Sequence, residues 1–191
     1  RRLQAVIGES AFLEKTDIQR QNIENITFET SIPNTIYDYE TGTIINITTT
    51  WDVSAMGDKS ILAWYETNNS QGALKVHIGS NYEIFANKNS SVLFAYIGFS
   101  NICTATETIT NLKLLNVSCV TNMYKMFYNC GYTAMTSLDL GDNFDTSNVT
   151  DMGAMFNYCG YTAMTSLNLR NKFNTSKVTL MGGMFHSCGY T

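Results

Sequence analysis

The nine residues CGYTAMTSL occupy positions 130–138 and recur, letter for letter, at positions 159–167, and a third CGYT occupies positions 188–191. The sequences that lead into the three cysteines are also related: NVSCVTNMYKMFYNC, DTSNVTDMGAMFNYC and NTSKVTLMGGMFHSC. The copies align at a spacing of 29 residues. A fixed period of about 20–50 residues is typical of proteins built from stacked repeats. The sequence therefore predicts an array of three units, of which the last is incomplete.

Each unit contains two short apolar patterns separated by turn residues. LDL at 138–140 and LNL at 167–169 alternate apolar and polar residues, which is typical of a strand with one buried face. MGAMFNYC, which ends at Cys159, places its apolar residues at i, i+3, i+4 and i+7, on one face of a short helix. Gly160 follows, where a left-handed residue often ends a helix. We therefore predict a unit of strand, turn, short helix and turn.

Comparison of the copies within this one chain separates inward from outward positions. All three copies keep the same residues in the pattern M-x-x-M-F-x-x-C. One outward position varies and is occupied by Cys119, Asn148 and Lys177. A unit of this size cannot bury its apolar face alone, so stacked units must share a continuous core. The predicted fold is thus an α/β solenoid. Its predicted repeat core consists of Met123, Met126, Phe127, Cys130, Met152, Met155, Phe156, Cys159, Met181, Met184, Phe185 and Cys188.

The sequence before the repeats is rich in short strand patterns. β-Branched and aromatic runs bounded by turn residues predict strands within 24–34, 43–53, 60–66, 73–80, 82–87 and 91–97. ETNNSQG at 66–72 is a hairpin connection, so we expect a meander of antiparallel strands. Because a stack of repeats needs its terminal core covered, we predict a β-rich capping region at 1–104 and three 29-residue repeats at 105–191, the last incomplete.

The repeats resemble a known family. TSNVTDMGAMFNYC at 146–159 and MTSLDL at 135–140 are similar to the repeat of the BspA-like leucine-rich-repeat proteins, mainly bacterial surface proteins. The resemblance covers residues 112–191, although this unit is longer than the usual family repeat and its first copy, ITNLKLLNVSC, is degenerate. It implies a leucine-rich-repeat-like stack of strand and short helix, an extracellular or cell-surface location, and adhesion to a surface protein or glycan of a host or neighbouring cell.

The residues favour no catalytic or metal site. No GxSxG, HExxH or P-loop motif occurs, and the cysteines lack CxxC spacing or a close histidine cluster, so we expect no enzyme, cofactor or metal. Asp139, Asp142 and Asp145 become asparagine one repeat later, which favours Asx turns over a calcium site because a neutral ligand would weaken calcium binding. The cysteine column is expected to be reduced, because helices pack about 8–10 Å apart; a bridge between Cys103 and Cys119 is left open.

The net charge and the hydropathy of the chain limit the classes of function that we expect. The net charge of −4 argues against a nucleic-acid partner, and no apolar run reaches the roughly 18 residues that would predict a membrane-spanning segment. We therefore expect a non-catalytic binding or adhesion module. Two alternatives remain: a structural subunit of a surface fibre or array, and a carbohydrate-binding module.

Three recurring tyrosines carry the carbohydrate alternative. Tyr132, Tyr161 and Tyr190 follow the repeated glycines and should form a ladder, which either seals the edge of the stack or offers exposed rings to a polymer. The chain ends inside the third copy, so we also expect Met184 and Phe185 to be uncovered and to promote self-association through the open C-terminal repeat.

Overall fold

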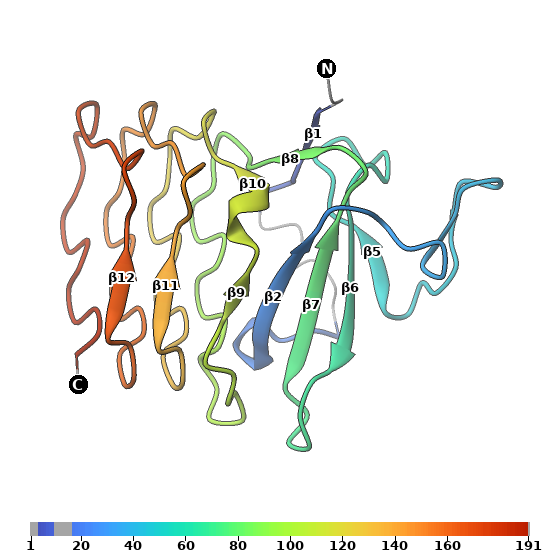
Figure 1. Ribbon diagram of the computed structural model, residues 1–191, viewed down its shortest axis with the longest axis horizontal. Coiled ribbons are helices and arrows are strands. Elements are labelled where there is room, and N and C mark those ends of the chain that lie inside the picture. Colours follow the sequence, from blue (N-terminus) through green and yellow to red (C-terminus); the bar gives the residue numbers. More distant parts are fainter. Residues whose placement is uncertain (1–3, 10–16, 191) are drawn as a thin grey trace.

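The computed structural model describes residues 4–9 and 17–190, which fold into several small sheets joined by many turns (Figure 1). Within these residues, helix is limited to two short 3-10 turns, η2 (Arg20–Asn22) and η3 (Leu112–Leu114). The strands are β1 (Gln4–Val6), β2 (Ile23–Glu29), β3 (Tyr37–Asp38), β4 (Thr43–Ile44), β5 (Thr50–Asp52), β6 (Leu62–Thr67), β7 (Leu74–Gly79), β8 (Glu83–Phe85), β9 (Ile109–Thr110), β10 (Leu115–Asn116), β11 (Ser137–Asp139) and β12 (Ser166–Asn168).

The largest sheet contains five strands in the order β5-β6-β7-β2-β9. Strands β5, β6 and β7 form the predicted antiparallel meander, with the predicted hairpin between β6 and β7. Strand β2, in contrast, lies parallel to both β7 and β9. Six of its seven residues are buried, because it is central in the sheet and both its faces are covered. The prediction of a purely antiparallel region was therefore wrong at β2.

Two further groups of strands complete the first part of the chain. Strand β8 lies between β1 and β10 in a parallel sheet of three short strands. Strands β3 and β4 form a small antiparallel hairpin in which Tyr37 lies opposite Ile44. The backbone of β8 leads directly into the stacked part of the molecule, because Ala86 donates its N–H to the carbonyl of Asn116.

Successive copies of the repeat lie one above another and are joined through their backbones. Strands β11 and β12 are parallel, with Leu138 opposite Leu167 (Figure 1). The M-x-x-M-F segments form turns rather than helices, at 122–131, 151–160 and 180–189. We call these segments the second, third and fourth layers.

The N–H groups of a layer alternate between two kinds of acceptor. Those of Met123 and Lys125 reach the carbonyls of Asp151 and Gly153 in the next layer, at 2.8 and 2.9 Å. The N–H of Met126 instead reaches the carbonyl of Met123, three residues earlier in its own layer. The pattern repeats between the third and fourth layers, so about every second N–H joins one layer to the next.

This arrangement overturns the predicted α/β solenoid of helical units. A helix would satisfy its N–H groups internally, but here half of them bond across layers. The backbone also takes a positive φ at three positions of the second layer, Lys125 (+54°), Asn129 (+55°) and Gly131 (+62°), which a helix cannot accommodate. The i, i+3, i+4, i+7 spacing was misread because it turns the same side chains inward in either backbone.

The segment 91–97, predicted as a strand, is another layer of the same kind. Val92, Phe94 and Tyr96 donate their N–H groups to carbonyls of the second layer at 2.8–2.9 Å. Positive φ values recur at Val92, Tyr96 and Gly98, matching those of the second layer. We call residues 90–98 the first layer; its sequence hides the relationship because it lacks the methionines and the cysteine.

A column of phenylalanines runs through the core of the stack. Phe94, Phe127, Phe156 and Phe185 occupy the same position in the four layers, and successive ring centroids lie 5.3, 5.3 and 5.5 Å apart. The column continues into the first part of the chain, because Phe94 packs edge-on against Phe28 of β2 at 6.1 Å. The sheet and the layers therefore share one hydrophobic core.

Candidate functional site

The repeated tyrosines form the predicted ladder along one edge of the stack. Gly131, Gly160 and Gly189 have φ values of +62°, +58° and +59°, as predicted for the residue after each segment. The tyrosines that follow stack in parallel: Tyr132 and Tyr161 at 4.9 Å and 13°, and Tyr161 and Tyr190 at 5.5 Å and 17°. The glycine turns thus place one tyrosine ring at the equivalent position of each of the three repeats.

Stacking determines what this ladder can offer a ligand. Tyr132 and Tyr161 are half-buried, and their faces cover each other, whereas Tyr190 is 67% exposed. The pKa of Tyr161 is raised, first by desolvation between the rings and then by the neighbouring tyrosines. A sugar that stacks on an aromatic ring needs a free face, so the inner tyrosines present only edges and hydroxyls. This geometry favours the sealing role over the carbohydrate-binding role.

A second aromatic column lies beside the ladder. Tyr158 contacts Tyr161 at 5.3 Å and His186 of the fourth layer at 5.6 Å. Tyr96 of the first layer packs edge-on against Tyr128 of the second layer, with ring centroids 5.5 Å apart. The Lys125 ammonium lies 4.8 Å from the centroid of the Tyr128 ring. The two columns together make an aromatic edge along the stack.

A groove runs along the strand face of the stack, from β9 across β11 toward β12. Its volume is about 580 Å³. Because side chains alternate along a strand, Ser137 and Asp139 of β11 point outward while Leu138 is buried in the core. The groove is lined by Thr106, Glu107, Ile109, Asn111, Leu112, Lys113, Thr136, Ser137, Leu138, Asp139, Gly141, Asp142, Asn143 and Arg170.

An ion pair between the ends of β11 and β12 lines this groove. Arg170 donates from Nε to Oδ1 of Asp139 at 2.8 Å and from a terminal nitrogen to the other carboxylate oxygen. A second terminal nitrogen lies 3.7 Å from Asp142. The hydrogen bonds from Arg170 hold the pKa of Asp139 below its ordinary value. The planar guanidinium therefore links the ends of β11 and β12 through an exposed, two-pronged ion pair.

Most of the predicted repeat core is buried, and its exceptions lie in the fourth layer. Met123, Met126, Phe127, Met152, Met155 and Phe156 are fully buried, and Met184 is 4% exposed. Met181 is 44% exposed and Phe185 is 47% exposed, because no layer lies beyond the fourth among the residues that the structure describes. The expectation of an uncovered side chain in the fourth layer is confirmed for Phe185 and wrong for Met184.

The cysteine column is closer than predicted. Cys130, Cys159 and Cys188 are free thiols in one column, and Cys103 and Cys119 are free as well, so the Cys103–Cys119 bridge is not formed. Hydrogen bonds with Cys130 and then Cys188, together with burial, raise the pKa of Cys159 well above its ordinary value. Layers bonded through their backbones lie about 4.8 Å apart, so the helix-spacing argument against a disulfide was wrong, although the thiols are reduced.

The aspartate and asparagine positions form Asx turns, as predicted. Oδ1 of Asp145 accepts the N–H of Ser147 at 2.9 Å, and Asn174 makes the same bond to Ser176 at 2.8 Å. The turn needs only a side-chain oxygen, so the charge is dispensable. The residues with described structure contain no group of three or more His, Cys, Asp or Glu side chains arranged to hold a metal ion.

Two charged residues that the sequence did not single out join segments that are far apart in the chain. The carboxylate of Glu24, a buried residue of β2, accepts hydrogen bonds from the Thr104 N–H at 2.7 Å and the Asn68 amide at 2.7 Å. Arg20 donates to the carbonyls of Val92 and Ala95 in the first layer. A buried charge needs partners, but those partners lie about 40 to 80 residues away, so no local pattern reveals them.

Desolvation shapes the ionisation of both groups. Burial, the largest influence, would raise the pKa of Glu24, but the hydrogen bonds from Thr104, Asn68, Ala105 and Asn69 together outweigh it, and the pKa is lowered. Burial lowers the pKa of Arg20 to about 10. Both groups remain charged at neutral pH and act as clamps between segments.

The comparisons with known proteins identify one family for part of the chain. Residues 98–190, a little under half of the sequence, match the family model described as Mycoplasma protein of unknown function, DUF285. No curated protein and no solved structure matches the chain. The match begins at Gly98, where the first layer ends. Across the described residues, no helix is both long enough and apolar enough to cross a membrane.

Proposed function

We propose that this chain is a non-catalytic binding module of a cell-surface or extracellular adhesion protein, and that its ligand lies along the strand-face groove. The single observation that carries the proposal is the groove itself, which runs from β9 past β11 to Arg170 and is lined by side chains of successive repeat units. Regular layers provide an extended, rigid surface, which is the usual advantage of stacked repeats in binding.

The chemistry of the groove fits a macromolecular ligand. Hydroxyls of Thr136 and Ser137, the amide of Asn143 and charges of both signs at Lys113 and Glu107 line it together. Such a surface can pair with the backbone and side chains of a protein or with the hydroxyls of a glycan. The partner that we propose is therefore a surface protein or glycan of a host or neighbouring cell.

The motifs in the repeats support this assignment. TSNVTDMGAMFNYC and MTSLDL resemble BspA-like surface proteins, and both lie inside the region that matches DUF285. We infer that residues 98–190 belong to a BspA-like repeat region that carries the adhesive surface outward from a cell.

The experiment measures binding of the labelled protein to arrays of cell-surface proteins and glycans and to cultured cells. Ser137→Arg places a long side chain in the groove and should reduce binding at least about tenfold, since a blocked contact of 1.4 kcal/mol has that effect. Ser176→Arg is the matched control, because Ser176 is exposed in an Asx turn and does not line the groove. Equal binding by both variants would contradict the proposed site.

A second function, that of a structural subunit, is favoured by the fourth layer. Leu180, Phe185 and Tyr190 are 59%, 47% and 67% exposed. The third layer donates N–H groups to the fourth, so the fourth offers the corresponding N–H groups to a further layer of the same kind. An open apolar edge with unpaired backbone groups favours association between chains. We propose that a second copy of the chain binds there.

Light scattering as a function of concentration tests this second function. The chain should form dimers or larger species, and Phe185→Lys should shift it to the monomer, because a charge on the open face opposes stacking. Lys88→Asn, an exposed change just before the first layer, should leave the distribution unchanged. A monomer at all concentrations would exclude assembly through the fourth layer.

A further inference from the structure

A second cavity lies in the first part of the chain, and none of its lining residues lines the strand-face groove. It has a volume of about 310 Å³, within the range of small-ligand sites. Its walls come from β1, the β3–β4 hairpin, the connection between β5 and β6, and the residues between β7 and β8. The lining residues are Gln4, Ile32, Tyr37, Tyr39, Asp58, Lys59, Ser60, Asn81 and Tyr82.

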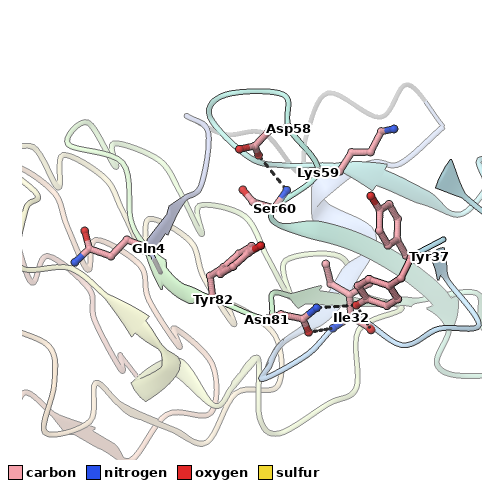
Figure 2. A pocket seen from close by; sticks show the side chains of 9 residues that line it. Gln4, Ile32, Tyr37, Asp58, Lys59, Ser60, Asn81 and Tyr82 are labelled. Carbon is pink, nitrogen blue, oxygen red and sulfur yellow. Dashed lines mark hydrogen bonds between the residues drawn. The ribbon is translucent and has the colours of Figure 1, made fainter. Parts of the chain in front are cut away.

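Aromatic rings dominate two sides of this cavity. Figure 2 shows Tyr82 and Tyr37 on opposite sides, with Asn81 and Ile32 at one end and Asp58 and Ser60 at the other. Tyr39 packs edge-on against Tyr37, with ring centroids 5.0 Å apart and planes at 83°. An edge-on contact leaves ring surface available, in contrast to the parallel stacking of the ladder tyrosines.

The polar groups at the end near Asn81 are held in place before any ligand arrives. Asn81 donates from Nδ2 to the Tyr39 hydroxyl at 2.8 Å and accepts the N–H of Ile32 at 3.3 Å. The Tyr39 hydroxyl in turn donates to the Ile32 carbonyl at 2.7 Å. A carboxamide has two donors and an oxygen with two lone pairs, so Asn81 retains one donor and one acceptor for a ligand.

The opposite end is also ordered and is close to electrically neutral. Asp58 accepts the N–H of Ser60 at 3.0 Å, and the Lys59 ammonium donates to the carbonyl of Gly42 at 2.9 Å. One carboxylate and one ammonium balance, so the cavity has no net preference for a charged ligand. Hydroxyl and amide groups beside ring surfaces suit a molecule that has many hydroxyls and one face of C–H bonds.

We propose that this cavity binds a neutral pyranose sugar of a glycan. One face of the sugar ring packs on Tyr82 or Tyr37, and its hydroxyls pair with Asn81, Ser60, Asp58 and Gln4. The site is separate from the strand-face groove and does not depend on it.

The test is a titration of isotope-labelled protein, followed by amide chemical shifts. The probes are the methyl pyranosides of glucose, galactose, mannose, N-acetylglucosamine and N-acetylgalactosamine, each to about 10 mM, because single-sugar affinities near millimolar suffice for detection. At least one probe should shift the amides of Lys59, Ser60, Asn81 and Tyr82 in a saturable manner. No saturable shift with any probe would overturn the proposal.

Two variants and one control locate the contact. Tyr82→Ala should weaken binding about tenfold, as loss of one ring contact implies, and Gln4→Ala, which removes an exposed amide from the rim, should weaken it severalfold. Tyr124→Ala is the matched control, because Tyr124 is 40% exposed and Tyr82 is 36% exposed, but Tyr124 lies in the second layer. Unchanged binding by Tyr82→Ala and Gln4→Ala, or shifts centred on Tyr132 and Tyr161, would refute this site. Ser137→Arg should leave sugar binding unchanged, so failure of the groove and failure of the cavity are distinguishable.

Discussion

The first and fourth layers have the same backbone but differ in what covers them. Phe94 of the first layer is fully buried against Phe28, and Arg20 satisfies the carbonyls of Val92 and Ala95. In the fourth layer, Phe185 at the equivalent position is 47% exposed. The contrast shows that inward position in the repeat does not by itself bury a side chain, because burial also requires a neighbour on each side of the layer.

The largest expected contrast is between two phenylalanines of one column. Phe156→Ala should lower the free energy of unfolding by about 3–5 kcal/mol, because Phe156 is fully buried between two layers. Phe185→Ala should cost less than about 1 kcal/mol, because that ring is covered on one side only. Chemical denaturation of both variants measures the difference; equal losses would show that the fourth layer is covered in solution.

Two glycine substitutions test the backbone of the layers. Gly160→Ala should cost about 2–4 kcal/mol, because φ is +58° and the new Cβ would lie 2.2 Å from Cβ of Met164. In Gly182→Ala the new Cβ meets nothing within 4 Å, so a change within about 0.5 kcal/mol is expected. Thermal melts compare the pair, and a mild effect of Gly160→Ala would rule out the tight turn described above.

The stability of the fold should depend on pH through Glu24. Its lowered pKa means that ionised Glu24 stabilises the fold at pH values above the ordinary value of 4.5, and that this contribution is lost as pH falls through the folded-state pKa. Glu24→Gln should cost about 1.5–3 kcal/mol at pH 7, the size of hydrogen bonds to a charged group. Unfolding measured from pH 7 to pH 3 should show the gap between the two proteins shrinking, whereas a constant gap would assign the loss to packing.

The smallest expected effect is a gain in stability. Ala154 has a φ of +51°, at the position that Gly183 occupies in the fourth layer. Ala154→Gly should therefore stabilise the protein by about 0.5–1 kcal/mol, because the strain of a left-handed alanine exceeds the added entropy of the unfolded chain. A lower melting temperature for this variant would mean that the Ala154 methyl group contributes packing that outweighs the strain.

Sequence reasoning identified the period, the inward residues and the position of the strands in each unit. All three features depend on the spacing of side chains along the sequence, as at Leu138, Phe156 and Cys159. The helix was wrong because the spacing of Met152, Met155 and Phe156 is the same in a helix and in the observed turns. What separates the two is where the N–H groups bond, and that depends on a neighbouring layer.

The parts of the candidate sites that involve distant segments could not be predicted. The tyrosine ladder was foreseen because its members share one phase of the repeat. The cavity beside Tyr82 was missed because its walls come from segments without a common pattern, at Gln4, Tyr37, Asp58 and Asn81. The clamp of Glu24 on Thr104 was missed for the same reason.

The alternation of hydrogen bonds also has a kinetic consequence. Each bond between the later layers joins residues close to one repeat apart, as from Met123 to Asp151 and from Met152 to Leu180. The entropy lost in closing a loop of one repeat is about the same for the third layer as for the second. The chain can therefore add layers in order once the first layer has formed. Amide protons of the second layer should then exchange with solvent most slowly and those of the fourth most rapidly. The stack would then unfold locally from the fourth layer toward the first, one repeat at a time.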